Sequence, residues 1–346
     1  MKIKVVVPQQ EFLIDVPDPV VPVPAPTPVP TPTPTPTPAP TGRRKFSPTS
    51  FYNKKLDANA AIHANSDGMV GELVRQTKVN AAAGIPYLPG INSGNGYSTG
   101  IYIVKDLATP RVPVIMVQGG KEATWFPFFN EWKTKGIRIP ENALVAGGTD
   151  GTLCIWDQVD DIEYDFWQLK KVNGVWNCSY GGQISDVSNA TGIMPTINGV
   201  KTGSTATSLA LLGGCILWSE LKAGVIGHAL GLAIPQGSSK YVYPAQRTDG
   251  GVQFWDGVNS LPAGTRFRFP ADIVINPAWC PMIKMMVEAV RDFGCVIQDR
   301  AGAVVFYAED TRQFTGKDEI PAFYGGKYAY QIMSEQFPFD KLKVLA

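Results

Sequence analysis

Short apolar runs rich in β-branched and aromatic residues, bounded by polar and turn residues, recur along the chain and predict β-strands. Runs of this kind include "GIYIVKDL", "VPVIMVQGG", "ALVAGGTDGTLCIWDQV", "RFRFP" and "AVVFYAED". The clearest hairpin signal is Asn173-Gly174, which separates two alternating runs rich in aromatic and aliphatic residues. Asn and Gly tolerate the positive φ angles that a two-residue turn requires. The pattern therefore favours a mainly β fold with many turns.

Three segments show helical spacing of apolar residues instead. "NSDGMVGELVRQTKVNA" places its apolar residues on one helix face after a capping segment. "CILWSELKAG" predicts a short helix that ends at Gly224, and "PMIKMMVEAVRDFG" predicts an amphipathic helix that stops at Gly294. We expect residues 43–346 to form a jelly-roll-like β-sandwich with a few peripheral helices.

The N-terminal part has a different pattern. In residues 22–42, proline occupies every even position from Pro22 to Pro40, which holds the chain in an extended polyproline II conformation. At about 3.1 Å per residue this rigid linker would span roughly 59 Å. Residues 1–21 contain two strand-like runs, "KIKVVVP" and "EFLIDVP". Two short strands bury little surface, so we expect this segment to dock on another protein or on copies of itself.

Composition narrows the classes of function. The 31 basic and 30 acidic residues give a net charge of +1, which does not support nucleic-acid binding through a basic field. The hydrophobic run near the N-terminus is too short for a signal peptide, and no run approaches the roughly 18 apolar residues of a membrane span. The five cysteines are scattered without metal-ligand spacing. We therefore expect synthesis in a cytoplasm without export, no membrane insertion, no metal and no cofactor.

Candidate catalytic residues are few. In "GVIGHALGLAIP", His228 would share a strand face with Leu230 and Leu232, either as a buried structural histidine or as a general acid–base group. Glycoside hydrolysis needs two facing carboxyl groups, and "GGTDGTLCIWDQVDDIEYDFW" is rich in them. If the chain is an enzyme, the candidates are His228, Asp157 and Asp186. Solvated carboxylates at turns and sheet edges are the alternative explanation.

Aromatic residues give a stronger indication of binding. Sugar rings stack their C–H faces on aromatic side chains, while amide, carboxylate and guanidinium groups bind the hydroxyls. The candidate ligand-binding residues on this basis are Trp156, Trp167, Gln183, Arg247 and Asp249. Core packing is the competing explanation for at least half of the aromatic residues.

Several linked blocks resemble one family. They are "FSPTSFYNKKLDANAAI", "IPENALVAGGTDGTLCIWDQ", "WNCSYGGQISDVS", "TATSLALLGGCILWSELKAGVIGHALGLAIP" and "YPAQRTDG". Together they are similar to a family of minor tail proteins of phages that infect mycobacteria and related actinobacteria, and to domains of secreted actinobacterial proteins. The resemblance covers about residues 46–310 and carries no catalytic signature.

The resemblance implies a virion protein in which residues 1–21 dock on phage tail proteins and the linker holds the domain toward the host. The favoured hypothesis is adsorption through a host cell-envelope glycan without cleavage. A glycan hydrolase or lyase is the first alternative, and a structural decoration of the tail or capsid is the second. A homotrimer is the commonest fibre arrangement, but no heptad pattern in the sequence enforces one.

Overall fold

The computed structural model describes residues 2–7, 10–15, 45–78, 88–94, 96–117, 127–249 and 256–346. The chain divides into two compact units, Met1–Thr35 and Pro36–Ala346. The linker predicted at 22–42 lies outside the described residues.

The first unit contains an antiparallel hairpin. Its strands are β1 (Lys2–Val7) and β2 (Gln10–Asp15), with Lys2 opposite Asp15 and Val7 opposite Gln10. Both predicted strands of the N-terminal segment are confirmed, and they pair with each other.

The second unit is built around a six-stranded sheet with the order β19-β16-β17-β15-β18-β3. Its strands are β3 (Gly90–Asn92), β15 (Leu230–Ile234), β16 (Arg266–Arg268), β17 (Cys295–Arg300), β18 (Val305–Tyr307) and β19 (Lys343–Val344). The sheet is mixed, because β15 pairs in parallel with β17 and antiparallel with β18. Side chains alternate between its faces, so that Leu232 and Ala233 enter two different apolar cores.

A four-stranded sheet has the order β12-β9-β8-β4. Its strands are β4 (Gly100–Val104), β8 (Leu153–Asp157), β9 (Ile162–Trp167) and β12 (Tyr180–Ser185). On β8, Cys154 and Trp156 enter the same core as Ala233 of the six-stranded sheet. Leu153 and Ile155 point to the opposite face and a third core. The two larger sheets therefore share one core between them, which we call the middle core.

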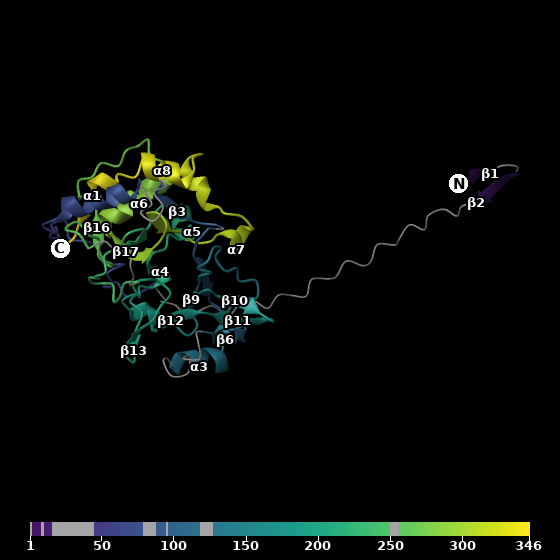
Figure 1. Ribbon diagram of the computed structural model, residues 1–346, viewed down its shortest axis with the longest axis horizontal. Helices are drawn as coiled ribbons and strands as arrows, with labels where there is room; N and C mark the ends of the chain where they lie inside the picture. Colours follow the sequence, from purple (N-terminus) through teal and green to yellow (C-terminus); the bar gives the residue numbers. More distant parts are fainter. Residues whose placement is uncertain are drawn as a thin grey trace. The chain divides into compact units, whose positions relative to one another are not determined.

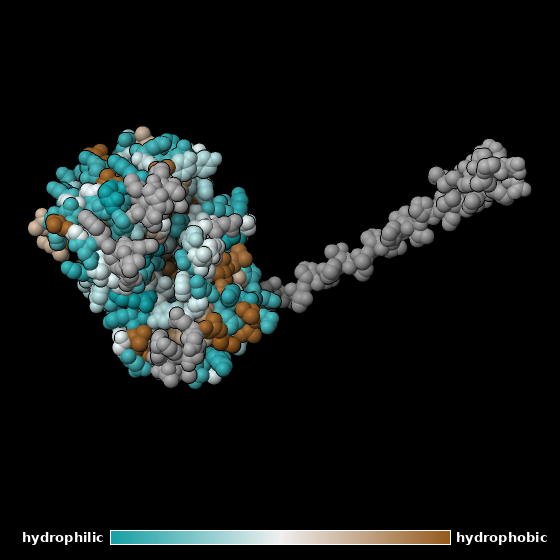
Figure 2. Space-filling view, in the orientation of Figure 1, coloured by the Kyte–Doolittle hydropathy of each residue, from teal (hydrophilic) through white to brown (hydrophobic). Residues whose placement is uncertain are grey.

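A three-stranded sheet and two strand pairs complete the described β-structure of the second unit. They are β6 (Val114–Met116) with β11 (Val175–Cys178) and β10 (Lys170–Val172), β5 (Arg111–Val112) with β7 (Ile137–Arg138), and β13 (Thr196–Ile197) with β14 (Val200–Lys201). The predicted turn between β10 and β11 is confirmed, with φ of 50° at Asn173 and 80° at Gly174. Val172 and Val175 beside this turn are exposed, and apolar residues gather in this part of the surface (Figure 2).

The described helices are α1 (Ser66–Gln76), α3 (Pro127–Thr134), α4 (Leu211–Gly214), α5 (Trp218–Ala223), α6 (Pro281–Asp292), α7 (Arg312–Thr315) and α8 (Ala329–Glu335). Short 3₁₀ turns span Val187–Asn189, Ile320–Tyr324 and Phe339–Lys341. In Figure 1, α1, α6 and α8 lie on one side of the six-stranded sheet. Their apolar residues belong to the same core as Leu232 of β15. The helices predicted from the sequence correspond to α1, α5 and α6, and Gly224 ends α5 with φ of 75°.

The mainly β prediction is confirmed, with strands in several sheets. One helix is not peripheral as expected. All four residues of α4 are buried, and α4 contacts β15 and β17 of one sheet and β8 of the other. Its sequence, "LLGG", gives no helical periodicity because it is too short. Two glycines allow it to fit between the sheets.

We predict that Gly213→Ala destabilises the protein, although alanine favours helix over glycine. A Cβ atom at Gly213 would lie 2.2 Å from Tyr52 Cε2 in the middle core, so the expected loss of unfolding free energy is about 1–3 kcal/mol. The matched control is Gly71→Ala on the exposed face of α1, where no atom lies within 4 Å. That change should stabilise by up to about 1 kcal/mol. Urea unfolding checks both, and a neutral Gly213→Ala would contradict the tight fit of α4.

Candidate functional site

A cavity of about 420 Å³ opens where strand ends of the two larger sheets meet. It lies at the starts of β4, β8 and β12 and at the ends of β9 and β17. Strands of both sheets, helix α4 and four connecting segments supply its lining residues, which are Tyr97, Thr99, Asp150, Thr152, Trp167, Tyr180, Ser204, Thr205, Ala206, Leu211, Arg247, Thr248, Asp249, Asp299, Arg300 and Tyr307. We call this cavity the strand-end pocket. Its size is in the range of small-molecule sites.

Two aromatic side chains form one wall of the strand-end pocket. Trp167 ends β9 and Tyr180 begins β12, and the two residues are direct partners in the antiparallel pair. Directly opposite residues project from the same face of a sheet, so the two rings lie side by side. Both are partly exposed to the cavity. This wall offers the flat apolar surface on which a sugar ring can stack.

Asp299 reaches the pocket because of a β-bulge. In β17, Ile297 pairs with Leu232 and Asp299 pairs with Ala233, which leaves Gln298 as the extra residue. Gln298 points into the middle core, where Tyr52 Oη donates a 3.0 Å hydrogen bond to its side-chain oxygen. A bulge turns two successive side chains toward one face. Asp299 therefore joins Gln298 on the inner face and lines the cavity.

The Asp299 carboxyl group is strongly perturbed. Burial raises its pKa to about 7, and the negative charges of Asp249 and Asp150 add to the rise. Two backbone N–H groups, of Ala206 and Arg300, donate 2.9 Å hydrogen bonds to its Oδ1 and oppose the rise. The group therefore holds a proton to near-neutral pH while it lines an open cavity.

The other two carboxyl groups of the strand-end pocket have different partners. Trp167 Nε1 donates a 3.3 Å hydrogen bond to Asp150 Oδ1. Arg300 forms a 3.3 Å ion pair with Asp249 Oδ2. Asp150 precedes β8 of the four-stranded sheet, whereas Asp299 belongs to β17 of the six-stranded sheet. The pocket thus combines aromatic rings with carboxyl groups from both sheets.

Arg247 shapes the pocket more than it serves as a free cation. Its guanidinium group donates to three backbone carbonyl oxygens, those of Lys201 at 3.2 Å, Gly203 at 2.9 Å and Thr205 at 2.7 Å. It also lies 5.6 Å from the centre of the Tyr180 ring. The side chain therefore fixes the 201–205 segment against the aromatic wall.

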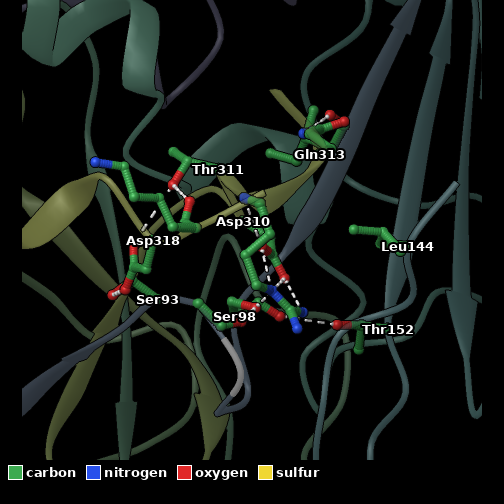
Figure 3. A network of polar contacts seen from close by, with 12 residues as sticks. Ser93, Ser98, Leu144, Thr152, Asp310, Thr311, Gln313 and Asp318 are labelled. Carbon is green, nitrogen blue, oxygen red and sulfur yellow. Dashed lines mark hydrogen bonds and ion pairs between the residues drawn. The ribbon is translucent and has the colours of Figure 1, made fainter. Parts of the chain in front are cut away.

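A polar network supports the Tyr97–Thr99 edge of the pocket from behind. Ser98 Oγ lies 3.0 Å from Asp310 Oδ2, and Arg312 pairs with the same carboxylate at 2.5 Å. Thr152, which lines the pocket, donates to the Ser98 carbonyl oxygen at 3.3 Å. Figure 3 shows Ser98 facing Asp310 with Thr152 beside them. The network is nearly closed to solvent and fixes this edge of the cavity.

Behind the pocket lies a buried acidic group in the middle core. One ligand-type atom each of Cys154, Glu163 and Asp165 lies within 4.8 Å of the others, the one such group with metal-ligand potential among the described residues. Burial and the charge of Asp165 raise the pKa of Glu163 well above its usual range, and burial raises the pKa of Asp165 to about 7. Two adjacent buried carboxyl groups cannot both ionise without compensation. A proton shared between the two carboxyl groups compensates their charge. The N–H groups of α4 add to this compensation, since Leu211 N donates to Asp165 at 2.9 Å.

The structure brings together three of the five predicted ligand-binding residues. Trp167, Arg247 and Asp249 all line the strand-end pocket. Trp156 is buried in the middle core, as the core-packing explanation for the aromatic residues expects. Gln183 points to the opposite face of β12, where its side-chain oxygen accepts a 2.7 Å hydrogen bond from Trp132 Nε1. It lines a separate cavity of about 360 Å³.

The three candidate catalytic residues lie away from the strand-end pocket. Asp157 ends β8, opposite the end at which the pocket opens, and forms a buried 2.7 Å ion pair with Arg138. Asp186 follows β12 at that same far end, where it is exposed and accepts a 2.9 Å hydrogen bond from Asn189. His228 precedes β15, whereas the pocket lies beyond the end of β17, the parallel neighbour of β15.

His228 is part of a buried ion-pair network. Its Nδ1 lies 2.8 Å from the Ala229 carbonyl oxygen and its Nε2 lies 3.1 Å from Glu220 Oε2. Each ring nitrogen thus lies within hydrogen-bond distance of an oxygen acceptor. Although burial opposes ionisation of Glu220, Lys45 and His228 lower the pKa of that carboxyl to about 2. This arrangement fits the structural alternative for His228, with α5 held against β15.

Sequence reasoning missed the other lining residues of the pocket, among them Asp150, Tyr180, Asp299 and Tyr307. The run "CVIQDR" starts as an apolar strand and ends in three polar residues, which marks a strand end. Nothing in the sequence indicates the bulge that turns Asp299 inward.

We predict that the free energy of unfolding falls as the pH rises from about 4 to about 7, in part because of Asp299. An unfolded Asp ionises near 3.9, whereas the folded group keeps its proton to about 7. Because the pKa of Asp299 is higher in the folded protein, its contribution to the free energy of unfolding is fully present below the unfolded pKa. That contribution is lost as the pH rises to the folded pKa. Asp299→Asn should remove this contribution, which is a slope of about 1.4 kcal/mol per pH unit between the unfolded and the folded pKa. Urea unfolding between pH 4 and 8 measures it, and equal slopes in both proteins would refute the assignment.

We predict that His228→Gln lowers the unfolding free energy by about 1–3 kcal/mol, because Glu220 would lose the ring nitrogen that lies 3.1 Å from its Oε2 inside the protein. The matched control is His63→Gln, an exposed histidine, which should change stability by less than about 0.5 kcal/mol. Thermal unfolding distinguishes the two variants. Equal stability of both would show that the His228–Glu220 pair contributes little.

Comparison with known proteins adds no family for this chain. No protein-family model, no curated protein and no solved structure matches it. Within the described residues, no helix is both long and apolar enough to cross a membrane. The function is therefore argued from the strand-end pocket.

Proposed function

We propose that the second unit binds a carbohydrate in the strand-end pocket and that the chain is a phage minor tail protein that uses this site for host adsorption. The observation that carries the proposal is the wall of Trp167 and Tyr180 in a cavity that also contains three carboxyl groups. Flat apolar rings with a few fixed polar groups are the usual features of a site for sugars.

The polar groups of the pocket suit hydroxyl-rich ligands. Asp249 presents carboxylate oxygens, which accept hydrogen bonds from sugar hydroxyls, and Asp150 adds a second carboxyl group to the lining. The cations Arg247 and Arg300 are already bonded to backbone carbonyls and to Asp249. An anionic ligand such as a nucleic acid would meet these carboxylates without a surplus of positive charge. A neutral glycan fits better.

The wider assignment rests on the layout of the chain and on the resemblance of its sequence blocks. In this proposal residues 1–21 dock on a tail protein, residues 22–42 act as the spacer, and the pocket contacts a glycan of the actinobacterial envelope. Several copies on one virion would strengthen weak individual contacts. A sandwich arrangement of the two larger sheets is part of the same proposal, supported by their shared middle core.

We predict that Trp167→Ala weakens binding of purified mycobacterial arabinogalactan by about tenfold or more, because the stacking surface is lost and tenfold corresponds to about 1.4 kcal/mol. The full chain is incubated with immobilised glycan, and the bound fraction is measured over a concentration series. The matched control is Tyr328→Ala, an aromatic residue that is 69% exposed and lies outside the pocket.

The control variant should bind like the wild type. If Trp167→Ala and wild type bind equally, the strand-end pocket is not the binding site. If neither binds, the carbohydrate proposal is wrong and a structural role in the virion becomes the better explanation.

A further inference from the structure

We propose that the strand-end pocket also cuts the glycosidic bond of its ligand by hydrolysis, with Asp299 as the general acid and Asp150 as the carboxylate that activates water. This inference rests on the proposed carbohydrate binding and adds a reaction to it. Its structural basis is the placement of two carboxyl groups in the cavity that holds the aromatic wall, one from β17 and one from the segment that precedes β8.

The surroundings of Asp299 suit a proton donor. Its Oδ1 is occupied by the N–H groups of Ala206 and Arg300. These bonds fix the plane of the carboxyl group and leave Oδ2 as the oxygen that can carry the proton. Tyr307, a buried residue of β18, also contacts the group. The β-bulge adds rigidity, because Gln298 is held in the middle core by Tyr52.

The surroundings of Asp150 suit a base. The neutral indole N–H of Trp167 donates to it at 3.3 Å and orients the carboxylate without adding a positive charge. Asp249, in contrast, is held in a 3.3 Å ion pair with Arg300, so one of its carboxylate oxygens is already occupied. Asp249 is therefore assigned to binding of sugar hydroxyls. Asp150 also lies next to the ring on which the sugar would stack.

The reaction balances with water as the only co-reactant. Asp299 transfers its proton to the glycosidic oxygen as the bond from that oxygen to the anomeric carbon breaks. A water oxygen bonds to the anomeric carbon while Asp150 removes one of its protons. The products are two sugars, one with a new hydroxyl group and one with a new reducing end. Proton exchange with solvent restores both carboxyl groups, as in the two-carboxylate scheme of glycosidases.

The protonation state of Asp299 predicts the pH dependence. Because burial raises its pKa to about 7, the acid is available through the mildly acidic and neutral range. Cleavage should therefore decline above about pH 7.

The test uses the full chain with purified mycobacterial arabinogalactan in H₂¹⁸O, and mass spectrometry of the released oligosaccharides. We expect fragments that carry one ¹⁸O at each new reducing end. Asp299→Asn and Asp150→Asn should each slow release by on the order of 10²–10⁴-fold while the glycan still binds, which also shows that the variants fold. Asp186→Asn, an exposed aspartate at the far end of β12, is the matched control and should cleave like the wild type.

Each other outcome rejects a distinct part of the argument. Binding without fragments overturns the hydrolysis but leaves the proposed binding function intact. Unsaturated fragments without ¹⁸O indicate elimination and overturn the hydrolytic roles. Unchanged cleavage by either pocket variant removes that residue from the reaction. If wild type neither binds nor cleaves the glycan, the inference and the proposed function both fail.

Discussion

The contact that the rest of the second unit depends on is the hydrogen bonding between α4 and the buried acidic pair of β9. Leu211 N donates to Asp165 at 2.9 Å and Leu212 N donates to Glu163 at 3.3 Å, inside the middle core. An apolar interface between two sheets can slide, because burial alone has no direction. Directional bonds from a helix to one sheet fix a single position. α4 also contacts β15 and β17 of the other sheet, so the two sheets are held through it.

This contact also positions the strand-end pocket. The segment that precedes α4 contains Ala206, whose N–H group binds Asp299, and Thr207, whose hydroxyl donates to the Gln298 carbonyl oxygen at 2.5 Å. The segment is thus tied to the bulge of β17 at one end and to the acidic pair at the other. Raised carboxyl pKa values at both ends indicate that this arrangement reduces stability at neutral pH. Groups that are costly to bury and that line a cavity are typical of functional sites.

Local patterns in the sequence were sufficient for much of the fold. The Asn173-Gly174 turn, the helix that ends at Gly224 and the amphipathic helix α6 depend on neighbouring residues, and all three were predicted. Trp167 and Asp249 were also chosen for their side-chain chemistry, and they meet in one pocket. Asp299 was missed because its orientation depends on a bulge that a contact with Tyr52 maintains, far away in the sequence.

Distant contacts also explain why His228 was a catalytic candidate in the sequence. A histidine in an apolar run suggests a functional group in isolation, and its partner Glu220 cannot be identified from spacing alone. The strand-end pocket differs, because the alternation of side chains along β9 relates one of its lining residues to the residues that hold α4. Glu163, Asp165 and Trp167 project from the same face of β9. This face passes from the closed middle core, where the first two residues hold α4, to the open end of the strand, where the third lines the cavity. The fixed position of α4 and the exposed ring of Trp167 are therefore consequences of one strand register.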